Sequence, residues 1–387
     1  GSAVCAPSRV VLMTGQHTGH ILRRANQSKH GLLALPEGQM TVARLLQEAG
    51  YATGGFGKWG LGNPGTTGAA EKQGFNLFFG YYDQKHAHDF YTDYLVRNGV
   101  DEPLPQSGRK TWEDYSHTRI ADETLKFIEQ NKDRPFFCYA AWTPPHGDYV
   151  IPDNAQYSEE PWPEIVRNYA AMVGLIDKDV GRLLQKIKDL GIDDNTLVIF
   201  SSDNGANKEF IETLASTGGL RGAKRMLYEG GIRTPFIARW PGKVPPGTTS
   251  DLLTSSMDFL PTAAELAGVP VPPGTDGISI LPTLLGQKQV AKHEALYFEI
   301  YEPYFQQAVR LGDWKGYRLG TKAPLELYDL KSDPAEKNNL ASNHPDIVGQ
   351  IEGIMAVEHT PSPHYDAPEQ FKKRAEASEK KSGGAEL

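Results

Sequence analysis

The residues from Cys5 to Gly15 read CAPSRVVLMTG, and this stretch predicts a helix that begins with a cysteine. Pro7 favours a helix start, because the missing N–H of proline costs nothing in the first helical turn. The unpaired N–H groups at such a start stabilise both thiolates and bound anions. On these residues alone two interpretations stay open. Cys5 is either reactive or part of an anion site, or it is the commoner case of a buried cysteine before an ordinary helix.

The composition is that of a globular chain with an acidic balance. The 387 residues are 39% hydrophobic and 23% charged, with a formal net charge of −8, which suits one large domain and a smaller one. The negative charge argues against nucleic-acid binding, which usually needs a basic face. An anionic substrate would require basic groups concentrated in one pocket. No apolar run approaches the ~20 residues of a membrane span. The two cysteines form no disulfide framework, and we expect Cys138 in the core.

Strand-like and helix-like runs alternate through the first two thirds of the chain. This pattern predicts an α/β fold with a mostly parallel central sheet flanked by helices. Short strands after residue 293 predict a small C-terminal antiparallel sheet with one helix packed on it. We therefore expect a main domain at 1–290, an α+β subdomain at 291–371 and a flexible tail at 372–387. The expected strands are 51–56, 136–142, 196–201, 234–240, 295–301, 307–311, 315–318 and 325–330, and the expected helices are 42–49, 122–130, 164–190, 259–267 and 345–358.

Polar residues stand next to the expected strands, where they can form one site. In open parallel sheets, ligands bind beyond the carboxyl ends of the strands. Lys58 follows the first strand, His146 follows the second, and Asp203 and Asn204 follow the third, while Lys224 comes shortly before the fourth. We expect these side chains to converge beside the cysteine at the helix start. Such a set suits a tetrahedral oxyanion together with a hard cation.

Each of these residues also has an ordinary structural interpretation. Asp-Asn-Gly is a common turn sequence, and lysine is usually a solvated surface residue. A histidine after Pro-Pro can simply cap the local backbone. Two features favour a site instead. The oxygens of Asp203 and Asn204 are ligands that suit Ca²⁺ or Mg²⁺, and glycines beside Lys58 and Lys224 indicate tightly packed backbone near a ligand.

Separate segments, in the right order along nearly the whole chain, resemble the sulfatase family. The number and order of the matches identify the chain as a member of that family, which implies an alkaline phosphatase-like α/β fold. The matching segments are CAPSR (5–9), GKWGLG (57–62), PH (145–146), SDNG (202–205), GAK (222–224) with YEGGIRTP (228–235), and LYDL (327–330).

The resemblance implies an unusual nucleophile. In that family the cysteine of CxPSR is oxidised after translation to formylglycine, and the hydrate of formylglycine attacks sulfur. Cys5 would be this residue, which makes a formylglycine-generating maturation enzyme a partner. Arg9 would hold the hydrate, and Lys58 and Lys224 would grip the sulfate oxygens.

The resemblance also implies roles for the remaining polar residues. His146 would assist at the leaving ester oxygen as the general acid. Asp203 and Asn204 would bind Ca²⁺, with Mg²⁺ as the alternative. The same resemblance implies a periplasmic or secreted location, because the related carbohydrate sulfatases are exported. The oligomeric state is left open.

The chain departs from the family pattern in two places. Gly60 stands where the family usually has a histidine that assists the formylglycine hydroxyl. Some carbohydrate sulfatases share this glycine, so we interpret it as a subgroup mark. The second departure concerns the paired aspartates of the family's first strand, which should precede Cys5 and are not in this sequence. The first strand of the 1–290 domain is therefore expected to be missing.

A segment with histidines and aromatic residues suggests the substrate. Residues 84–88 read QKHAH, they follow a loop expected at 80–82, and aromatic residues come after them. Flat rings for stacking and donors for hydroxyls are what a sugar site needs, although a mixed surface segment is an equal interpretation on residue types alone. His88 is our first candidate for a contact with the sugar, His86 is the second, and Arg233 is the third.

These observations predict a formylglycine- and Ca²⁺-dependent sulfatase that acts on a sulfated carbohydrate, of galactose type in our preferred interpretation. One alternative is a phosphodiester or phosphonate monoester hydrolase, because the same nucleophile motif occurs there. A second alternative is a protein of the same fold that binds sulfated glycans without turnover. Gly60 and the absent aspartates motivate this second alternative. The sugar and the sulfate position are beyond the sequence.

Overall fold

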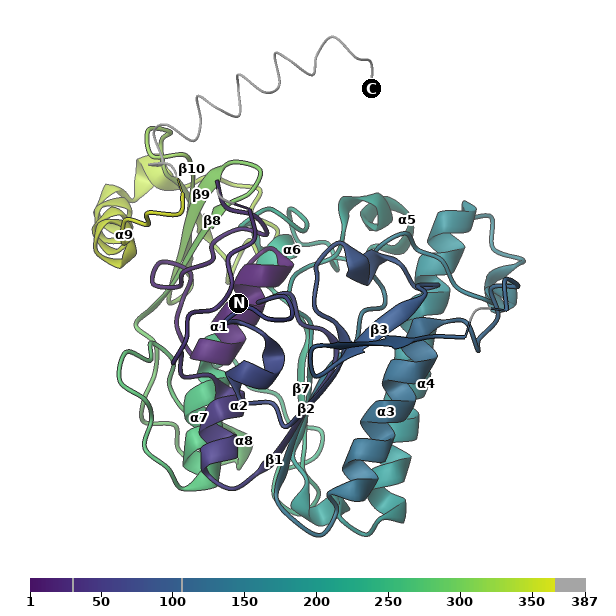
Figure 1. The fold of residues 1–387 in the computed structure, drawn as a ribbon. Helices are drawn as coiled ribbons and strands as arrows, with labels where there is room; N and C mark the ends of the chain where they lie inside the picture. The colour runs from purple at the N-terminus through teal and green to yellow at the C-terminus, as the bar shows by residue number, and fades with distance from the viewer. Residues whose placement is uncertain (30, 106, 366–387) are drawn as a thin grey trace.

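The computed structural model describes residues 1–29, 31–105 and 107–365, and it places helices on both faces of a central sheet. Helices α3 and α4 cover one face, and α1, α2 and α7 gather on the other (Figure 1). The elements are α1 (Cys5–Thr14), α2 (Val42–Glu48), β1 (Ala52–Lys58), β2 (Leu77–Tyr81), β3 (Tyr94–Arg97), β4 (Val100–Pro103), α3 (Ser116–Gln130), β5 (Phe136–Ala141), α4 (Glu164–Asp189), β6 (Val198–Ser201), α5 (Ile211–Leu214), α6 (Glu229–Ile232), β7 (Phe236–Arg239), α7 (Phe259–Ala267), α8 (Leu281–Leu284), β8 (Ala295–Tyr301), β9 (Phe305–Leu311), β10 (Trp314–Leu319), β11 (Glu326–Asp329) and α9 (Pro345–Glu358).

The central sheet is mixed. Its strand order is β4-β3-β2-β1-β5, with β1 parallel to both β2 and β5, and with antiparallel pairs at β2–β3 and β3–β4. Strands β6 and β7 form a separate antiparallel pair among the described residues. The expected α/β fold with flanking helices is confirmed. The parallel part is confined to three strands, because β3 and β4 form a hairpin that extends one edge.

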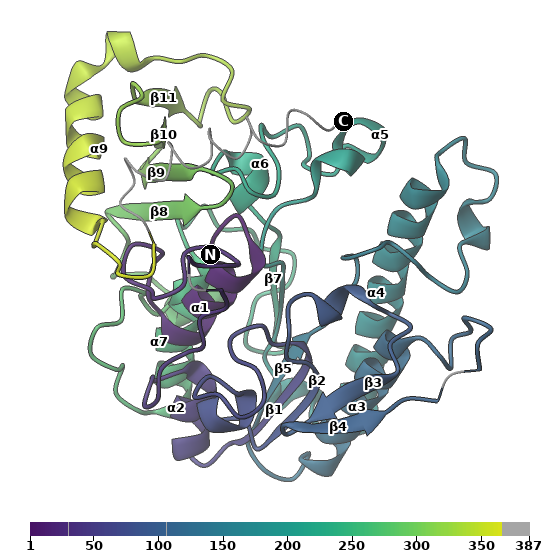
Figure 2. The same ribbon diagram turned by 45° about the horizontal axis from the view of Figure 1, so that its top comes forward.

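The C-terminal sheet was also predicted correctly. Strands β8 to β11 form a four-stranded antiparallel sheet in the order β11-β10-β9-β8, and α9 runs along it (Figure 2). The domain boundary at 290/291 stays a prediction. Leu296, Phe298 and Tyr328 of this sheet share one buried cluster with Val10 of α1, so the two parts have a common core. The predicted tail at 372–387 lies outside the described residues.

Strand β2 corrects one expectation. The sequence predicted a loop at residues 80–82, but β2 runs through Gly80 to Tyr81, and Phe78, Phe79 and Tyr81 are fully buried. A side chain at Gly80 would collide with the carbonyl oxygen of Gly57 in β1. The glycine therefore marks a close approach of two strands, and not a turn.

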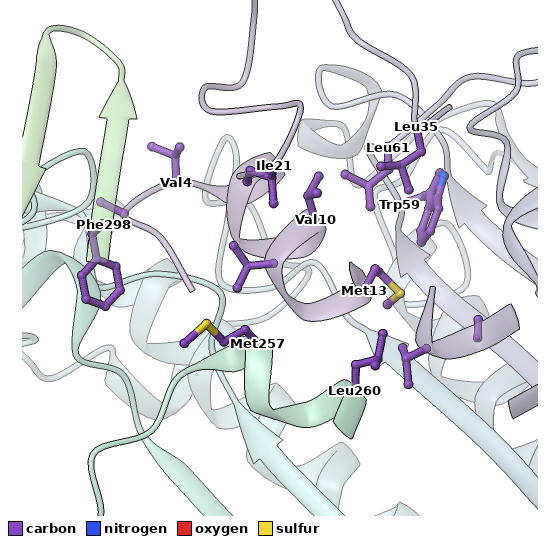
Figure 3. Packing of buried hydrophobic residues seen from close by; sticks show 14 of the residues in the cluster. Val4, Val10, Met13, Ile21, Leu35, Trp59, Leu61, Met257, Leu260 and Phe298 are labelled. Atoms are coloured by element: carbon purple, nitrogen blue, oxygen red, sulfur yellow. The ribbon is translucent and has the colours of Figure 1, made fainter. Parts of the chain in front are cut away.

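Helix α1 lies in the middle of the core, which explains why its sequence is apolar beyond the first turn. Val10 and Met13 are almost fully buried. Figure 3 shows them among side chains from distant segments, including Trp59, Leu61 and Leu260. Gly15 closes the helix with a left-handed conformation (φ 69°), which glycine adopts without strain. Packing on all sides fixes the position of the N-terminal end of α1.

A buried ionic network joins the C-terminal sheet to α6. Lys315 of β10 is fully buried, and its Nζ lies 2.8 Å from Oε1 of Glu229 and 3.6 Å from Oε1 of Glu336. The backbone N–H of Glu229 donates to Oε2 of Glu336 (2.8 Å). This network holds the first turn of α6, which packs against the polar residues that follow β6. None of the helices in the described part of the chain has the length and apolar composition that crossing a membrane requires.

The core position of α1 generates a stability prediction. Met13→Ala should lower the free energy of unfolding by about 2–5 kcal/mol, because it leaves a cavity between packed helices. Val357→Ala is the control, since Val357 is 76% exposed and should change stability by less than about 0.5 kcal/mol. Urea unfolding followed by circular dichroism measures both. Equal losses in the two variants would contradict a core role for α1.

Candidate active site

Helix α1 places Cys5 and Arg9 one turn apart on the same face. The helix begins at Cys5, and one of its free N–H groups, that of Ala6, donates to Oδ1 of Asn26 (3.1 Å). Cys5 and Arg9 are both buried, at 3% and 8% exposure. The predicted helix start with a cysteine in its first turn is therefore present.

His146 lies between the thiol and a lysine. Its Nε2 is 3.9 Å from Sγ of Cys5 and 2.8 Å from Nζ of Lys224. An ammonium group can only donate, so Nε2 accepts from Lys224 and the proton of the neutral ring lies on Nδ1. Nδ1 is buried and has no hydrogen-bond partner within the described residues. Lys224 thus fixes both the ring and its tautomer.

Arg9 contacts residues from several elements of the site. Its guanidinium donates to the backbone oxygen of Lys58, at the end of β1, and to the hydroxyl of Tyr139 in β5 (3.4 Å). NH2 of Arg9 also pairs with Oδ2 of Asp203, beyond β6, at 3.2 Å. One side chain therefore joins α1 to the end of β1, the middle of β5 and the segment after β6. We call Cys5, Arg9, Lys58, His146, Asp203 and Lys224 the cationic cluster.

The cationic cluster contains more positive than negative charge. Burial lowers the pKa of Lys58, whose side chain is 2% exposed, and the charges of Arg9 and Lys224 lower it further against the opposing effect of Cys5. Burial opposes ionisation of Asp203, but Arg9, Lys224 and Lys58 outweigh it and hold the pKa of this carboxyl below its usual range. Three cationic side chains thus face one carboxylate, and an anion bound there would complete the charge balance.

Backbone contacts place the loops that carry Lys224 and Asp203. The N–H of Lys224 donates to the carbonyl of Ala206, and the next N–H in the chain donates to Ala3, just before α1 (both 2.9 Å). The N–H of Gly205 donates to Gly231 in α6 (2.9 Å), and a side chain at Gly205 would collide with the adjoining backbone of α6. Tight backbone was predicted at the glycines beside Lys58 and Lys224, and it is found at Gly57, where a side chain would collide with the carbonyl oxygen of Ala141. At Gly205, for which nothing was predicted, the close approach is made by α6.

Asp203 and Asn204 offer oxygen atoms that fit a cation. Oδ1 of Asn204 is buried and has no hydrogen-bond partner in the described part of the chain, while its Nδ2 donates to the carbonyl of Gly205 (2.9 Å). An unpaired buried carbonyl oxygen costs free energy unless it meets a donor or a cation. Together with the ionised carboxylate of Asp203, it makes a donor set of the type that Ca²⁺ or Mg²⁺ prefers.

The structure separates the three expected substrate contacts. His88 lies beside the cluster, with its ring 4.6 Å from that of His146. Nε2 of His86 instead bonds to Oγ1 of Thr92 (2.7 Å), and its ring packs on Tyr81 and Tyr94. Arg233 is 60% exposed, and NH1 lies 3.9 Å from Oε2 of Glu229.

The sequence analysis missed one residue of the site, Tyr139, and it placed Gln84 in the expected sugar segment without linking it to Gly60. Tyr139 reaches Arg9 from the middle of β5, and its period-2 position in a predicted strand was the only signal. Gln84 fills the space beside Gly60, because a side chain at Gly60 would collide with Nε2 of Gln84. Gly60 also has a left-handed conformation (φ 74°). Nothing in the local sequence links Gly60 to Gln84.

A family model for sulfatases matches residues 1–269, and one for the C-terminal region of N-sulphoglucosamine sulphohydrolase matches residues 222–355. The chain belongs to the sulfatase family. It is therefore a sulfuric ester hydrolase. Human arylsulfatase A is 33% identical over 87% of this chain and 74% of its own length. An uncharacterised sulfatase of Escherichia coli, YdeN, is 29% identical over 91% of this chain and 71% of its own length.

Solved structures agree with this assignment. The crystal structure of Ps i-CgsB superimposes with a TM-score of 0.84 at 25% identity, covering 97% of this chain and 87% of that chain. The same protein has been solved with k-i-k-neocarrahexaose. The N-acetylgalactosamine-6-sulfatase of the dog is 33% identical over 81% of this sulfatase and 62% of its own length.

His146 generates a pH prediction. Burial, followed by the charges of Lys58 and Lys224, places the pKa of His146 far below its usual 6.5. As the pH falls below 6.5 the unfolded chain takes up a proton that the folded site refuses, so the fold loses stability, by about 2 kcal/mol at pH 5. His146→Gln should remove this loss.

Urea unfolding at pH 7.5 and pH 5 measures the difference. His344→Gln is the matched control, because His344 precedes α9 outside the cationic cluster, and it should keep the wild-type pH dependence. The same pH dependence in all three proteins would show that His146 is not held neutral in the folded state.

Proposed function

We propose that this sulfatase hydrolyses sulfate esters on a carbohydrate, and that Cys5 is the precursor of its nucleophile. The observation that carries the proposal is the position of Cys5. Its Sγ lies 3.9 Å from His146, at the edge of a cluster in which three cations face one carboxylate. In a chain with a net charge of −8, this local excess of positive charge matches a small tetrahedral anion.

Matured Cys5 would be a formylglycine, whose hydrate supplies an oxygen nucleophile for sulfur. The chain's own residues then bind and orient the sulfate group. Lys58 and Lys224 neutralise the charge of its oxygens, and Arg9 holds the nucleophile and offsets the charge that develops at sulfur. Such preorganised electrostatic stabilisation is usually the largest contribution to group transfer of this kind.

His146 is the proton donor to the leaving oxygen in this proposal. In the structure the imidazole of His146 is neutral, and its Nε2 accepts a hydrogen bond from Lys224. A bound sulfate ester brings negative charge next to the ring, which raises the pKa of the imidazole, and its oxygens compete for Lys224. The sulfate group therefore both frees Nε2 and favours the protonated ring that can act as the general acid.

Asp203 and Asn204 would hold Ca²⁺, with Mg²⁺ as the alternative. The unpaired buried oxygen of Asn204 and the ionised carboxylate of Asp203 support this assignment. When bound, the cation would add positive charge on the side of the cluster where Asp203 lies. The chain's contribution is to keep the two oxygens fixed through the Gly205 contact with α6.

The relatives support a sulfated sugar, and we propose the galactose type because one of them is named an N-acetylgalactosamine-6-sulfatase. The family model that matches residues 222–355 is named for N-sulphoglucosamine, and a protein of similar fold has been solved with k-i-k-neocarrahexaose. His88, next to His146, is placed to contact the sugar that carries the sulfate. His86 would act indirectly, because its ring is held by Thr92 and Tyr81. Arg233 would act from the exposed rim. The formylglycine-generating partner and the periplasmic or secreted location stay predictions.

The test measures sulfate release from galactose-type sulfated oligosaccharides by the full chain, coexpressed with a formylglycine-generating enzyme. Wild-type protein should release sulfate, and Cys5→Ala should lower kcat/KM at least about a thousandfold, as expected for loss of a nucleophile. Cys138→Ala is the matched control, because Cys138 lies inside β5, and it should keep activity.

Two outcomes would contradict this proposal. Faster turnover of the phosphate ester than of the sulfate ester of one aryl alcohol would favour a phosphodiester or phosphonate hydrolase. Tight binding of sulfated oligosaccharides, equal in wild type and Cys5→Ala and without sulfate release, would favour a glycan-binding protein of the same fold.

Metal removal provides a separate prediction. Dialysis against a chelator should lower kcat more than tenfold, and added Ca²⁺ should restore it, because the cation supplies charge next to the sulfate. Asn204→Ala should raise the Ca²⁺ concentration needed for half-maximal activity. Full activity after chelation, in both wild type and Asn204→Ala, would rule out a cation at these residues.

A further inference from the structure

A second group of ligand-type side chains lies at the opposite end of α1 from Cys5. His17 and His20 follow the C-terminal end of this helix, and Glu358 is the last residue of α9. Nε2 of His17 is 2.9 Å from Oε2 of Glu358, and Nε2 of His20 is 3.9 Å from the same oxygen. The two imidazole rings lie in contact, tilted by 37° with centroids 4.0 Å apart. Three donor atoms from two distant segments thus lie within 4.8 Å of one another.

Asp276 holds both histidines in place through hydrogen bonds. It accepts from Nδ1 of His20 (2.9 Å) and from the backbone N–H of His17 (2.9 Å). The N–H groups of Asp276 and Gly277 both donate to the carbonyl of Gly15 (2.9 and 3.0 Å), which fixes Asp276 to the end of α1. A histidine that gives its Nδ1 proton to a carboxylate presents the lone pair of Nε2. This carboxylate–histidine arrangement is the usual support of a metal-binding imidazole.

We propose that His17, His20 and Glu358 bind one divalent transition metal ion, with Zn²⁺ the expected ion and Asp276 as the supporting carboxylate. Two imidazoles and a carboxylate are ligands that zinc accepts and Ca²⁺ does not favour. Donor atoms around tetrahedral zinc lie about 3.3 Å apart, since each bond is about 2.0–2.1 Å. Oε2 of Glu358 lies 2.9 Å from Nε2 of His17 and 3.9 Å from Nε2 of His20, one distance below this value and one above it.

Burial and access also suit an ion. The side chain of His17 is 9% exposed, while those of His20 and Glu358 are 31% and 36% exposed. The ion can therefore enter from solvent, and a water molecule can fill the fourth position. Gly19 lies against the end of α9, since a side chain there would collide with the carbonyl oxygen of Glu358. This contact holds the two segments together before any ion binds.

Binding requires one local change. At present Nδ1 of His17 accepts from the N–H of Gly19 (3.1 Å), so the His17 proton lies on Nε2 and is donated to Glu358. Coordination through Nε2 moves this proton to Nδ1, and the bond from Gly19 is lost. The ion would link the end of α1 to the end of α9, which are more than 300 positions apart in sequence and lie near each other in the fold (Figure 2).

The site is tested by equilibrium dialysis of the full chain with Zn²⁺, followed by metal analysis, in a buffer with excess Ca²⁺ to occupy any oxygen site. Cys5→Ala is the parent protein, because the thiol beside His146 could hold zinc by itself. The parent should bind one Zn²⁺ per chain, and Zn²⁺ should raise its Tm. His20→Gln and Glu358→Gln in this parent should each weaken binding at least tenfold.

Further variants make the test specific. Asp276→Asn should weaken zinc binding by about tenfold, as expected for a supporting carboxylate, while His344→Gln and Asp203→Asn should bind zinc like the parent. Melting curves without metal establish that each variant is folded. Failure of the parent to bind zinc, or binding that both His20→Gln and Glu358→Gln leave unchanged, would show that these side chains form only an ion-pair network. Neither result bears on sulfate hydrolysis, because Cys5 is absent from every protein used.

Discussion

The ion pair between Arg9 and Asp203 is the interaction on which the site depends. Among the described residues Asp203 is the carboxylate that pairs with Arg9 beside Lys58 and Lys224, and without it three cationic groups would be held together with Arg9 and Lys58 almost fully buried. Like charges that are removed from water repel strongly. The ion pair lowers the free-energy cost of this repulsion, and the cluster keeps a net positive charge. The remaining positive charge is what a sulfate group would neutralise. The same excess of positive charge therefore limits the stability of the cluster and would give it affinity for an anion.

One buried helix, α1, holds these charged residues together. Arg9 belongs to α1, yet its partners lie at the end of β1, in β5 and beyond β6. The loop that carries Lys224 bonds to the residues after β6 and to Ala3. Because α1 is packed on all sides (Figure 3), the groups around its first turn have little freedom to separate. The last turn of the same helix leads directly into His17 and His20, so α1 supports two groups of polar residues at its two ends.

The C-terminal sheet supports the site through α6. Lys315 and Glu336 hold Glu229 at the start of α6, and α6 in turn packs against Gly205. The chain of contacts from β10 to Asn204 therefore runs through buried ion pairs and close backbone approaches. Lys315 belongs to this chain of contacts, and it is as fully buried as the hydrophobic core.

Sequence alone determined the α/β class, the C-terminal sheet, the helix start at Cys5 and the identity of the clustered residues, because period, turn residues and local motifs are encoded within short segments. Contacts between segments were not encoded in that way. That Lys224 fixes His146, that Gln84 fills the space at Gly60, and that Glu358 meets His17 were decided by tertiary structure. The loop wrongly expected at residues 80–82 has the same origin. A glycine indicates a turn in isolation, and only the neighbouring strand shows that Gly80 is there to let two backbones approach.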